Sequence, residues 1–310
     1  MNGISVSTYG LVLIVTVLVA HLAYALRLQA AGKKSVSAVI SLVLSSILGF
    51  VFAKVGFVLM EFDKEFGTYG FEAFLRMRAD AFSVFFGGFG VLLGVALSAR
   101  LVRLSPAWAL DAFAPCGALI LCGVRIGEYF LESIGHGALL PDDSPFTFFP
   151  LSVMKDYGYD YVEYYWAVFV LEALLAFIVC AVFLLKNPDG TGTTCEIVMY
   201  CLAAPQIFSE SLRARCMKWG FVRVEQVLCG VLLLLLIERS CRLCRRQTGF
   251  FARFWPVLGV ILGIGIIVWC EFALDKFAIS NTLVRIIMIA VVILMMLLEF
   301  LAMARRKADT

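Results

Sequence analysis

The chain has 310 residues, of which 62% are hydrophobic, 16% are charged and 27 are phenylalanine. Its mean hydropathy of +0.94 excludes an ordinary soluble domain, in which about 25% of the residues are charged. The 26 basic and 23 acidic residues leave a net charge of +3, and we expect no nucleic-acid partner. The composition indicates an integral membrane protein.

Nine segments are apolar over roughly the 20 residues that a helix needs to cross the hydrocarbon core of a bilayer. We therefore expect an all-α fold, a polytopic integral membrane bundle of about nine transmembrane helices. The sixth segment is short and carries polar residues, so it should be buried against other helices, and the seventh is also short. The segments are 8–26, 36–60, 81–99, 107–125, 165–185, 195–210, 224–238, 254–274 and 282–303.

The basic residues predict how the chain is oriented. Arg27, the first of them, follows the first apolar segment, which favours a retained helix with an outside N-terminus over a cleaved signal peptide. With nine helices, the dense basic stretches at 238–253 and 304–310 then lie on the cytoplasmic side, in agreement with the positive-inside rule. We expect a multi-pass protein of the plasma membrane whose N-terminus is outside and whose C-terminus is cytoplasmic.

Two further patterns favour structure over chemistry. Cys241 and Cys244 have the spacing of a metal-binding pair, but no second pair or nearby histidine completes a site. We therefore expect no metal or nucleotide cofactor. Gly87, Gly90 and Gly94 are spaced for close packing between helices, because small residues let two backbones approach.

Polar residues recur near the outer ends of the predicted helices. Because ionisable residues in or beside a membrane helix usually face a cavity or a partner, we expect an outward-facing polar cavity. Glu172 and Asp111 lie within apolar segments, and the outer arginines could be their partners. The residues of this set are Tyr9, Arg125, Glu128, Glu132, Glu172, Glu210, Arg213, Arg215, Glu225 and Gln226.

A purely structural interpretation stays open for the charged pairs. Arg125 and Glu128 are three residues apart, as are Glu210 and Arg213. Each pair could be an ordinary contact along one helix, worth about 0.2–0.5 kcal/mol. Arg125 could also extend its charge to the lipid headgroups.

Several short motifs, taken together, resemble the bacterial prolipoprotein diacylglyceryl transferase family. The stretch DAFAPCGALILCGVRIG at 111–127 is similar to the family's Asp-x-x-Ala-Pro helix and the Gly-Arg-(Ile/Leu)-Gly that follows it. Other motifs occur in the family's order. They are Tyr-Gly at 9–10, a Gly-Gly helix at 84–94, Glu-Ala-Leu-Leu at 172–175, Glu-x-x-Arg at 210–213 and a helix that begins around Gln226.

The resemblance covers residues 9–238 and implies a seven-helix core. We place this core at 1–240. Residues 241–310 would add a basic cytoplasmic loop, two transmembrane helices and a short cytoplasmic tail.

The chain departs from the family pattern where chemistry is expected. The family's histidine before Gly-Gly, which is needed for activity, is Phe86 here, and the asparagine after Arg-Ile-Gly is Glu128. The first arginine of Arg-x-x-x-Glu is Gln206. In the loop that follows Glu128, only Glu132 or Ser133 lies near the family's glutamate position.

The resemblance implies transfer of a diacylglyceryl group from phosphatidylglycerol to a cysteine thiol, with release of glycerol phosphate. The thiol would belong to the lipobox of a prolipoprotein signal peptide at the outer leaflet. Arg125 and Arg213 would hold the phosphate, since guanidinium groups bind phosphate oxygens bidentately. Glu128 or His136 would replace the missing base. The other implied site residues are Glu210, which orients an arginine, Tyr9, which donates to the headgroup, and Glu172, Gln206 and Gln226, which bind substrate.

Two classes of function stay open. One is a divergent transferase, supported by the residues that are retained. The other is a catalytically inactive or repurposed homologue that binds lipid or a membrane partner, supported by Phe86, Glu128 and Gln206 together. A transporter is a weaker third interpretation, because the sequence shows no inverted repeat or pair of broken helices.

Two long loops complete the prediction. Residues 61–80 mix apolar and charged positions and could form a helix along the outer membrane surface. Residues 140–165 are acidic and aromatic. They could cover the outer cavity as a lid or form a partly ordered surface loop.

Overall fold

The structure is a computed structural model that describes residues 7–78, 80–131, 135–141, 143–158, 161–219, 222–243, 250–276 and 281–308. The chain divides into two compact units. The first unit contains Met1–Val198 and Arg213–Arg215, and the second contains Met199–Leu212 and Cys216–Thr310.

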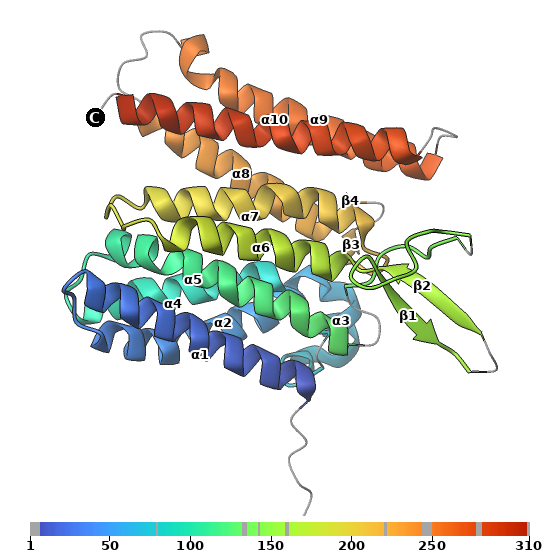
Figure 1. Ribbon diagram of the computed structural model, residues 1–310, viewed down its shortest axis with the longest axis horizontal. Coiled ribbons are helices and arrows are strands. Elements are labelled where there is room, and N and C mark those ends of the chain that lie inside the picture. Colours follow the sequence, from blue (N-terminus) through green and yellow to red (C-terminus); the bar gives the residue numbers. More distant parts are fainter. Residues whose placement is uncertain are drawn as a thin grey trace, which may run out of the picture. The chain divides into compact units, whose positions relative to one another are not determined.

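Most of the first unit is helical (Figure 1). α5 packs against α1, α4 and α6, and α2 packs against α1 and α4. Its elements are α1 (Thr8–Ala30), α2 (Val36–Met60), α3 (Phe62–Tyr69), η1 (Gly70–Phe74), α4 (Val84–Leu101), α5 (Pro106–Gly127), η2 (Glu128–Phe130), β1 (Ser152–Asp156), β2 (Val162–Trp166) and α6 (Val168–Leu184).

The second unit is built on three helices that pack against one another, α8, α9 and α10. α7 begins in the first unit and ends in the second. The elements from α7 onward are α7 (Thr193–Leu212), β3 (Lys218–Trp219), β4 (Val222–Arg223), α8 (Val224–Leu243), α9 (Phe250–Lys276) and α10 (Asn281–Ala308).

Among the described residues, a long helix lies at each of the nine predicted segments, with ends that differ by five residues or fewer. Six of these helices are long and apolar enough to cross a membrane, and α6 is an apolar helix of 17 residues. The chain is therefore an all-α, multi-pass membrane protein. The six spans are Thr8–Ala30, Val36–Met60, Val84–Leu101, Pro106–Phe130, Phe254–Leu274 and Thr282–Arg305.

Serine caps fix the starts of three helices. The hydroxyl oxygens of Ser7, Ser83 and Ser105 accept a backbone N–H three residues ahead, at 3.2, 3.5 and 3.5 Å. Such caps satisfy donors that the first helical turn leaves unpaired. Pro106 at the first position of α5 strengthens that start, because its fixed backbone angle suits a helix and its missing N–H is not needed there.

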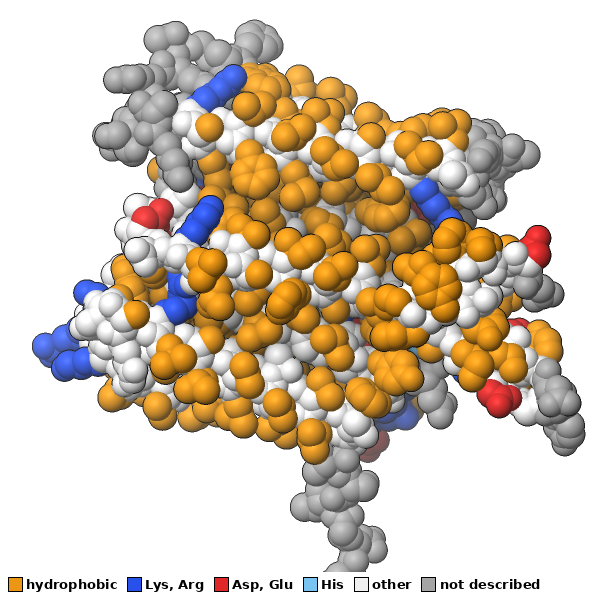
Figure 2. All heavy atoms as spheres, in the orientation of Figure 1, with side chains coloured by type: hydrophobic (Ala, Val, Ile, Leu, Met, Phe, Trp, Pro, Cys, Tyr) orange, Lys and Arg blue, Asp and Glu red, His pale blue; other side chains and the backbone are white. Residues whose placement is uncertain are grey.

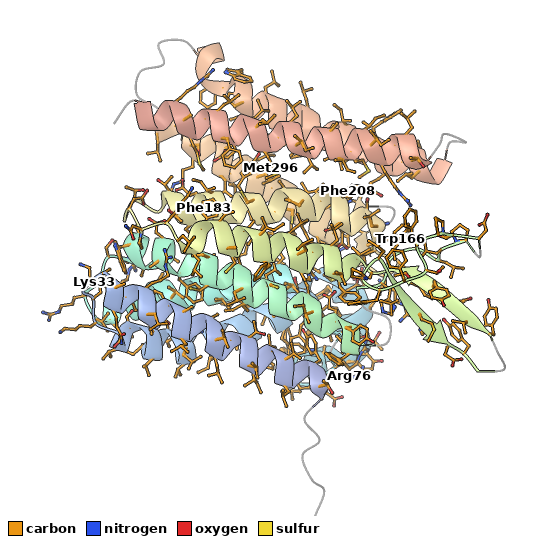
Figure 3. The ribbon with its side chains drawn as sticks, in the orientation of Figure 1. Lys33, Arg76, Trp166, Phe183, Phe208 and Met296 are labelled. Atoms are coloured by element: carbon orange, nitrogen blue, oxygen red, sulfur yellow. The ribbon has the colours of Figure 1, made fainter. Side chains whose placement is uncertain are left out.

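The surface of the first unit follows the expectation for a lipid-facing bundle. Figure 2 shows hydrophobic side chains over the middle of its visible face, with basic side chains toward one end. On α1, Leu11, Leu18 and Leu22 are at least half exposed, as expected for side chains that contact lipid. Lys33 and Arg76 lie at opposite ends of α2, beyond its apolar length (Figure 3).

Two glycines of α4 show the close helix packing that was predicted, and the partner helix is α2. A Cβ on Gly90 would lie 2.7 Å from the carbonyl carbon of Leu48, and one on Gly94 would lie 2.5 Å from the Cα of Ser45. Both neighbours are backbone atoms, which cannot move aside as a side chain could. The glycines therefore set the distance between the two helices.

Both long loops contain regular structure. The 61–80 segment, where the sequence predicted a helix, contains α3 and η1, and Lys54 of α2 donates to the carbonyl of Arg76 at 2.7 Å. The second loop contains an antiparallel hairpin of β1 and β2, with Ser152 opposite Trp166. The sequence did not predict this hairpin, and a lid role for the segment stays a prediction.

Replacing Gly94 by alanine is expected to lower the free energy of unfolding by about 1–3 kcal/mol, because the new methyl group forces α2 and α4 apart. Gly88→Ala is the matched control, since a Cβ there meets nothing within 4 Å. Thermal or denaturant unfolding in detergent would measure both variants. Equal effects of the two substitutions would contradict the close packing of α2 and α4.

Candidate functional site

Four buried charged side chains meet in the first unit. Arg125 lies in the last turn of α5, and Glu128 follows it as the first residue of η2. Glu172 lies near the start of α6, and Arg213 comes directly after α7. We call these four residues the ion cluster. The sequence predicted all four as site residues, and the structure brings them into contact.

Each glutamate of the ion cluster contacts both arginines. Arg125 Nη1 lies 2.5 Å from Glu128 Oε1, and Arg125 Nε lies 3.0 Å from Glu172 Oε2. Arg213 Nη2 lies 2.8 Å from Glu128 Oε2 and also contacts Glu172 Oε2. Arg213 Nε donates to Glu172 Oε1 at 3.1 Å. Arg125 and Glu128 thus pair with Glu172 and Arg213 on other elements as well as with each other. The pair is part of a network and is not an isolated contact along one helix.

Burial gives this network its energetic weight. The exposed fractions of Arg125, Glu128, Glu172 and Arg213 are 3%, 3%, 5% and 7%. A buried charge without a partner is costly, and removing one member of a buried pair typically destabilises a protein by about 3–5 kcal/mol. The two arginines can lie here because the two glutamates neutralise them.

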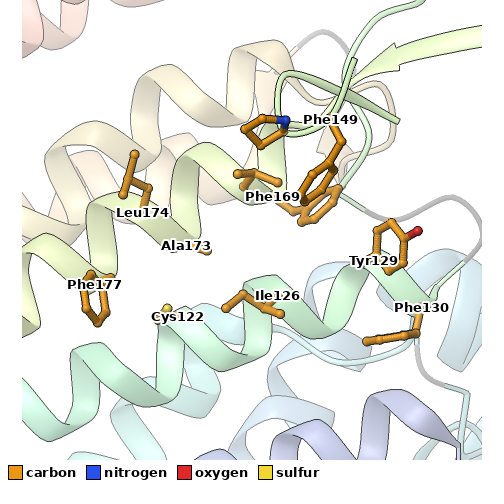
Figure 4. A pocket seen from close by; sticks show the side chains of 11 residues that line it. Cys122, Ile126, Tyr129, Phe130, Phe149, Phe169, Ala173, Leu174 and Phe177 are labelled. Carbon is orange, nitrogen blue, oxygen red and sulfur yellow. The ribbon is translucent and has the colours of Figure 1, made fainter. Parts of the chain in front are cut away.

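An apolar cavity of about 560 Å³ lies between α5 and α6, the helices that carry Arg125 and Glu172 (Figure 4). Ile126 and Tyr129 flank the charged residues of α5 and η2 in sequence, while Phe169 and Ala173 flank Glu172 on α6. The same short segments therefore supply both the charges and the apolar wall. The cavity is lined by Cys122, Ile126, Tyr129, Phe130, Phe149, Pro150, Phe169, Val170, Ala173, Leu174 and Phe177.

Two other expected positions of the first unit lie in packed surroundings. The Tyr9 ring lies over Gly127, where an added Cβ would come within 2.8 Å of the ring. Gly127 directly precedes Glu128 in the chain, so Tyr9 lies close to the ion cluster. Phe86 packs on Gly56 of α2, where a Cβ would meet the Phe86 Cβ at 2.6 Å. At the position of the family's histidine, this chain therefore has a helix-packing contact.

His136 lies next to the ion cluster. Gly135 has a φ of +80°, and a Cβ on it would collide with Glu128 Oε2. The carbonyl of His136 accepts the N–H of Ala214, directly after Arg213, at 3.0 Å. The His136 ring is buried, with its centroid 6.1 Å from that of Tyr165. Within the described part of the chain, its Nε2 has no hydrogen-bond partner. Burial is the main cause that lowers the pKa of His136, and the positive charge of Lys155 lowers it further. The negative charge of Glu128 partly opposes both effects.

Three predicted residues belong to the second unit. The Gln226 amide donates to the Ile207 carbonyl at 2.9 Å and to Glu271 Oε1 at 2.8 Å. The backbone carbonyl of Glu210 accepts from Arg223, while its side chain is buried. Gln206 lies in the same helix as Glu210, one turn earlier.

Glu271 and His136 are the functional candidates that the sequence either missed or ranked low. Glu271 lies on α9, outside the predicted seven-helix core, and its carboxylate contacts Arg223 Nε at 3.5 Å as well as Gln226. The signal for it was an acid within an apolar helix, the same signal that identified Glu172. His136 gave only a weak signal, because a single loop histidine is most often exposed.

The predicted arginine partner of Asp111 is wrong. Asp111 is fully buried, and its carboxylate accepts the backbone N–H groups of Gly192 at 2.8 Å and Cys195 at 2.9 Å. These N–H groups lie at the start of α7, where unpaired donors and the helix dipole favour an anion. The Glu172 prediction is confirmed, since its partners are arginines. Glu132, Ser133 and Cys244 lie outside the described residues.

The imidazole of His136 is expected to titrate below the usual histidine value of about 6.5, because burial and Lys155 disfavour its charged form. NMR of protein labelled only at histidine would report this, since the chain has two histidines and His136→Gln assigns the signals. Lys155→Gln should raise the value slightly. A His136 titration at or above 6.5 would contradict this environment.

Comparison with known proteins identifies the family. The family model for prolipoprotein diacylglyceryl transferase matches residues 1–238. The phosphatidylglycerol–prolipoprotein diacylglyceryl transferases of two Clostridium kluyveri strains are each 24% identical over 251 residues, covering 77% of this chain and 92% of theirs. The chain belongs to the prolipoprotein diacylglyceryl transferase family.

Proposed function

We propose that this protein transfers a diacylglyceryl group from phosphatidylglycerol to the lipobox cysteine of a prolipoprotein, at the outer face of the bacterial plasma membrane. Family membership and the activity for which the Clostridium relatives are named support this proposal. The single observation that carries it is the ion cluster with two buried arginines, on segments that also line an apolar cavity.

The two parts of the site match the two parts of a phospholipid. A cavity of about 560 Å³ with aromatic and aliphatic walls falls within the range of ligand pockets, about 300–1,000 Å³, and suits acyl chains. Arg125 and Arg213 are the cations for the phosphate. Glu172 pairs with both, accepting a hydrogen bond from Arg213 Nε and lying 3.0 Å from Arg125 Nε. Tyr9 lies close enough to η2 to donate to the headgroup. Glu210, Gln206 and Gln226 are proposed as further substrate contacts.

The reaction requires a base for the incoming thiol, because the thiolate is the nucleophile. Both carboxylate oxygens of Glu128 are already engaged by guanidinium groups. His136 is the better candidate, because its Nε2 has no hydrogen-bond partner among the residues that the structure describes. The sulfur would then attack the glycerol carbon, a C–S bond would form as the C–O bond to phosphate breaks, and glycerol phosphate would leave with that electron pair.

The orientation proposed from the sequence is consistent with this site. Tyr9 opens α1 and packs on Gly127, so the ion cluster lies at the N-terminal end of α1. Lys33 lies beyond the opposite end of that helix. An outside N-terminus would therefore place the ion cluster at the outer leaflet and Lys33 in the cytoplasm.

A second candidate function is a non-catalytic homologue that binds lipid. The specific observation in its favour is the packing of Phe86 on Gly56, which leaves an apolar contact where the family has the histidine needed for activity. On this alternative, the cavity and the arginines would hold a phospholipid without cleaving it.

A thioether-lipidation assay separates the two functions. Purified protein in liposomes with phosphatidylglycerol is mixed with a lipobox peptide, and mass spectrometry detects the diacylglyceryl adduct on cysteine. We expect Arg125→Ala to reduce the rate by about 10²–10³-fold, the typical cost of losing one donor to the transition state. Arg100→Ala is the control, because Arg100 is an exposed arginine in the last turn of α4. Folded wild-type protein without activity would support the non-catalytic function.

A further inference from the structure

The most unusual member of the ion cluster is Glu128. The family pattern has an uncharged asparagine at this position, whereas this chain has a carboxylate. Its two oxygens are divided between the two arginines, Oε1 at 2.5 Å from Arg125 Nη1 and Oε2 at 2.8 Å from Arg213 Nη2. One carboxylate therefore bridges both guanidinium groups, as a phosphate with two free oxygens would.

The two glutamates contact the arginines differently. Glu172 contacts Nε of both arginines, the nitrogen next to the side-chain stem, and also Nη2 of Arg213. Glu128 contacts one terminal nitrogen of each arginine. Terminal N–H groups are the ones that a ligand reaches first, so Glu128 occupies a position on each arginine that an incoming anion would need.

The surrounding backbone supports this placement of Glu128. Gly135 lies against Glu128 Oε2 and Phe169, and any side chain at residue 135 would collide with both. The positive φ of Gly135 also favours glycine there. Only 3% of Glu128 is exposed, so bulk solvent cannot take the place of the arginines as partners of its carboxylate. Glu128 is therefore a built-in part of the cluster.

We infer that Glu128 is a resident anion, which occupies the phosphate-binding N–H groups of Arg125 and Arg213 and thereby removes the preference of this site for anionic over zwitterionic phospholipids. The inference rests on the proposed function in one respect, that the arginine pair receives the lipid phosphate. It adds a residue that determines headgroup selectivity.

The charges of the ion cluster give the reason. The charges of its two arginines and two glutamates sum to zero. Phosphatidylglycerol carries one negative charge, so its binding would place three negative charges beside two positive ones. Phosphatidylethanolamine adds no net charge. Because an uncompensated charge is costly in a buried site, the anionic lipid loses the advantage that two free arginines would give it. Neutralising Glu128 restores one positive charge and with it that advantage.

Binding of two lipids with identical acyl chains tests this inference. Full-length protein in detergent is titrated with phosphatidylglycerol or phosphatidylethanolamine, and native mass spectrometry gives the ratio of the two affinities. We expect a ratio within about 3-fold for wild type and for Glu128→Asp, which keeps the charge. We expect a preference of roughly 10-fold or more for phosphatidylglycerol in Glu128→Gln and Glu128→Asn, which is the size of effect that one or two kcal/mol of charge interaction produces.

An unchanged ratio in Glu128→Gln would overturn the inference, as would a wild-type protein that already prefers phosphatidylglycerol more than about 10-fold. The wild-type ratio decides the matter even if a variant fails to fold. The lipidation assay runs in parallel and separates the two proposals. A shifted ratio without activity in any variant contradicts the transferase proposal alone. In an active protein, Glu128→Gln should lower KM for phosphatidylglycerol more than it changes kcat.

Discussion

Two guanidinium groups buried at the end of membrane helices require carboxylates beside them, and the rest of this site depends on that requirement. Arg125 and Arg213 come from segments 88 residues apart in the chain, and Glu172 on α6 contacts both. The ion cluster therefore ties the end of α5, the start of α6 and the segment after α7 to one another within the first unit. The same contacts keep the arginines in place for a ligand, since an arginine with a fixed geometry loses little entropy when it binds.

Charge and apolar surface lie side by side because both come from the same short segments. Glu172 on α6 and Glu128 on η2 belong to the ion cluster, and their sequence neighbours Ala173 and Tyr129 line the apolar cavity. A phospholipid has this same combination of a charged headgroup next to apolar chains. The proposed lipid site combines both kinds of surface, while Phe86 and Glu128 stand where the family pattern has histidine and asparagine. His136, close to Glu128, is the side chain that we propose as the base.

The sequence predicted the helices well, because apolar length alone defines a membrane-crossing segment, and it predicted the four members of the ion cluster from ionisable residues near helix ends. It could not predict which partner each acid takes. Glu172 pairs with arginines and Asp111 with backbone N–H groups, although both looked alike as acids in apolar segments. Glu271 was missed because its partners Gln226 and Arg223 lie on α8 and β4, about 45 residues earlier. The β1–β2 hairpin was missed because its aromatic residues equally suit a membrane interface.

A double-mutant cycle between Glu172 and Arg213 tests the central claim, that the ion cluster is a single coupled network. Unfolding of wild type, Glu172→Gln, Arg213→Gln and the double variant in the same detergent gives the coupling free energy of the pair. Residues in one buried network show coupling of about 0.5–3 kcal/mol, and the bidentate geometry predicts a value above about 1.5 kcal/mol. Effects that add within about 0.3–0.5 kcal/mol would contradict the network and, with it, the resident-anion role of Glu128.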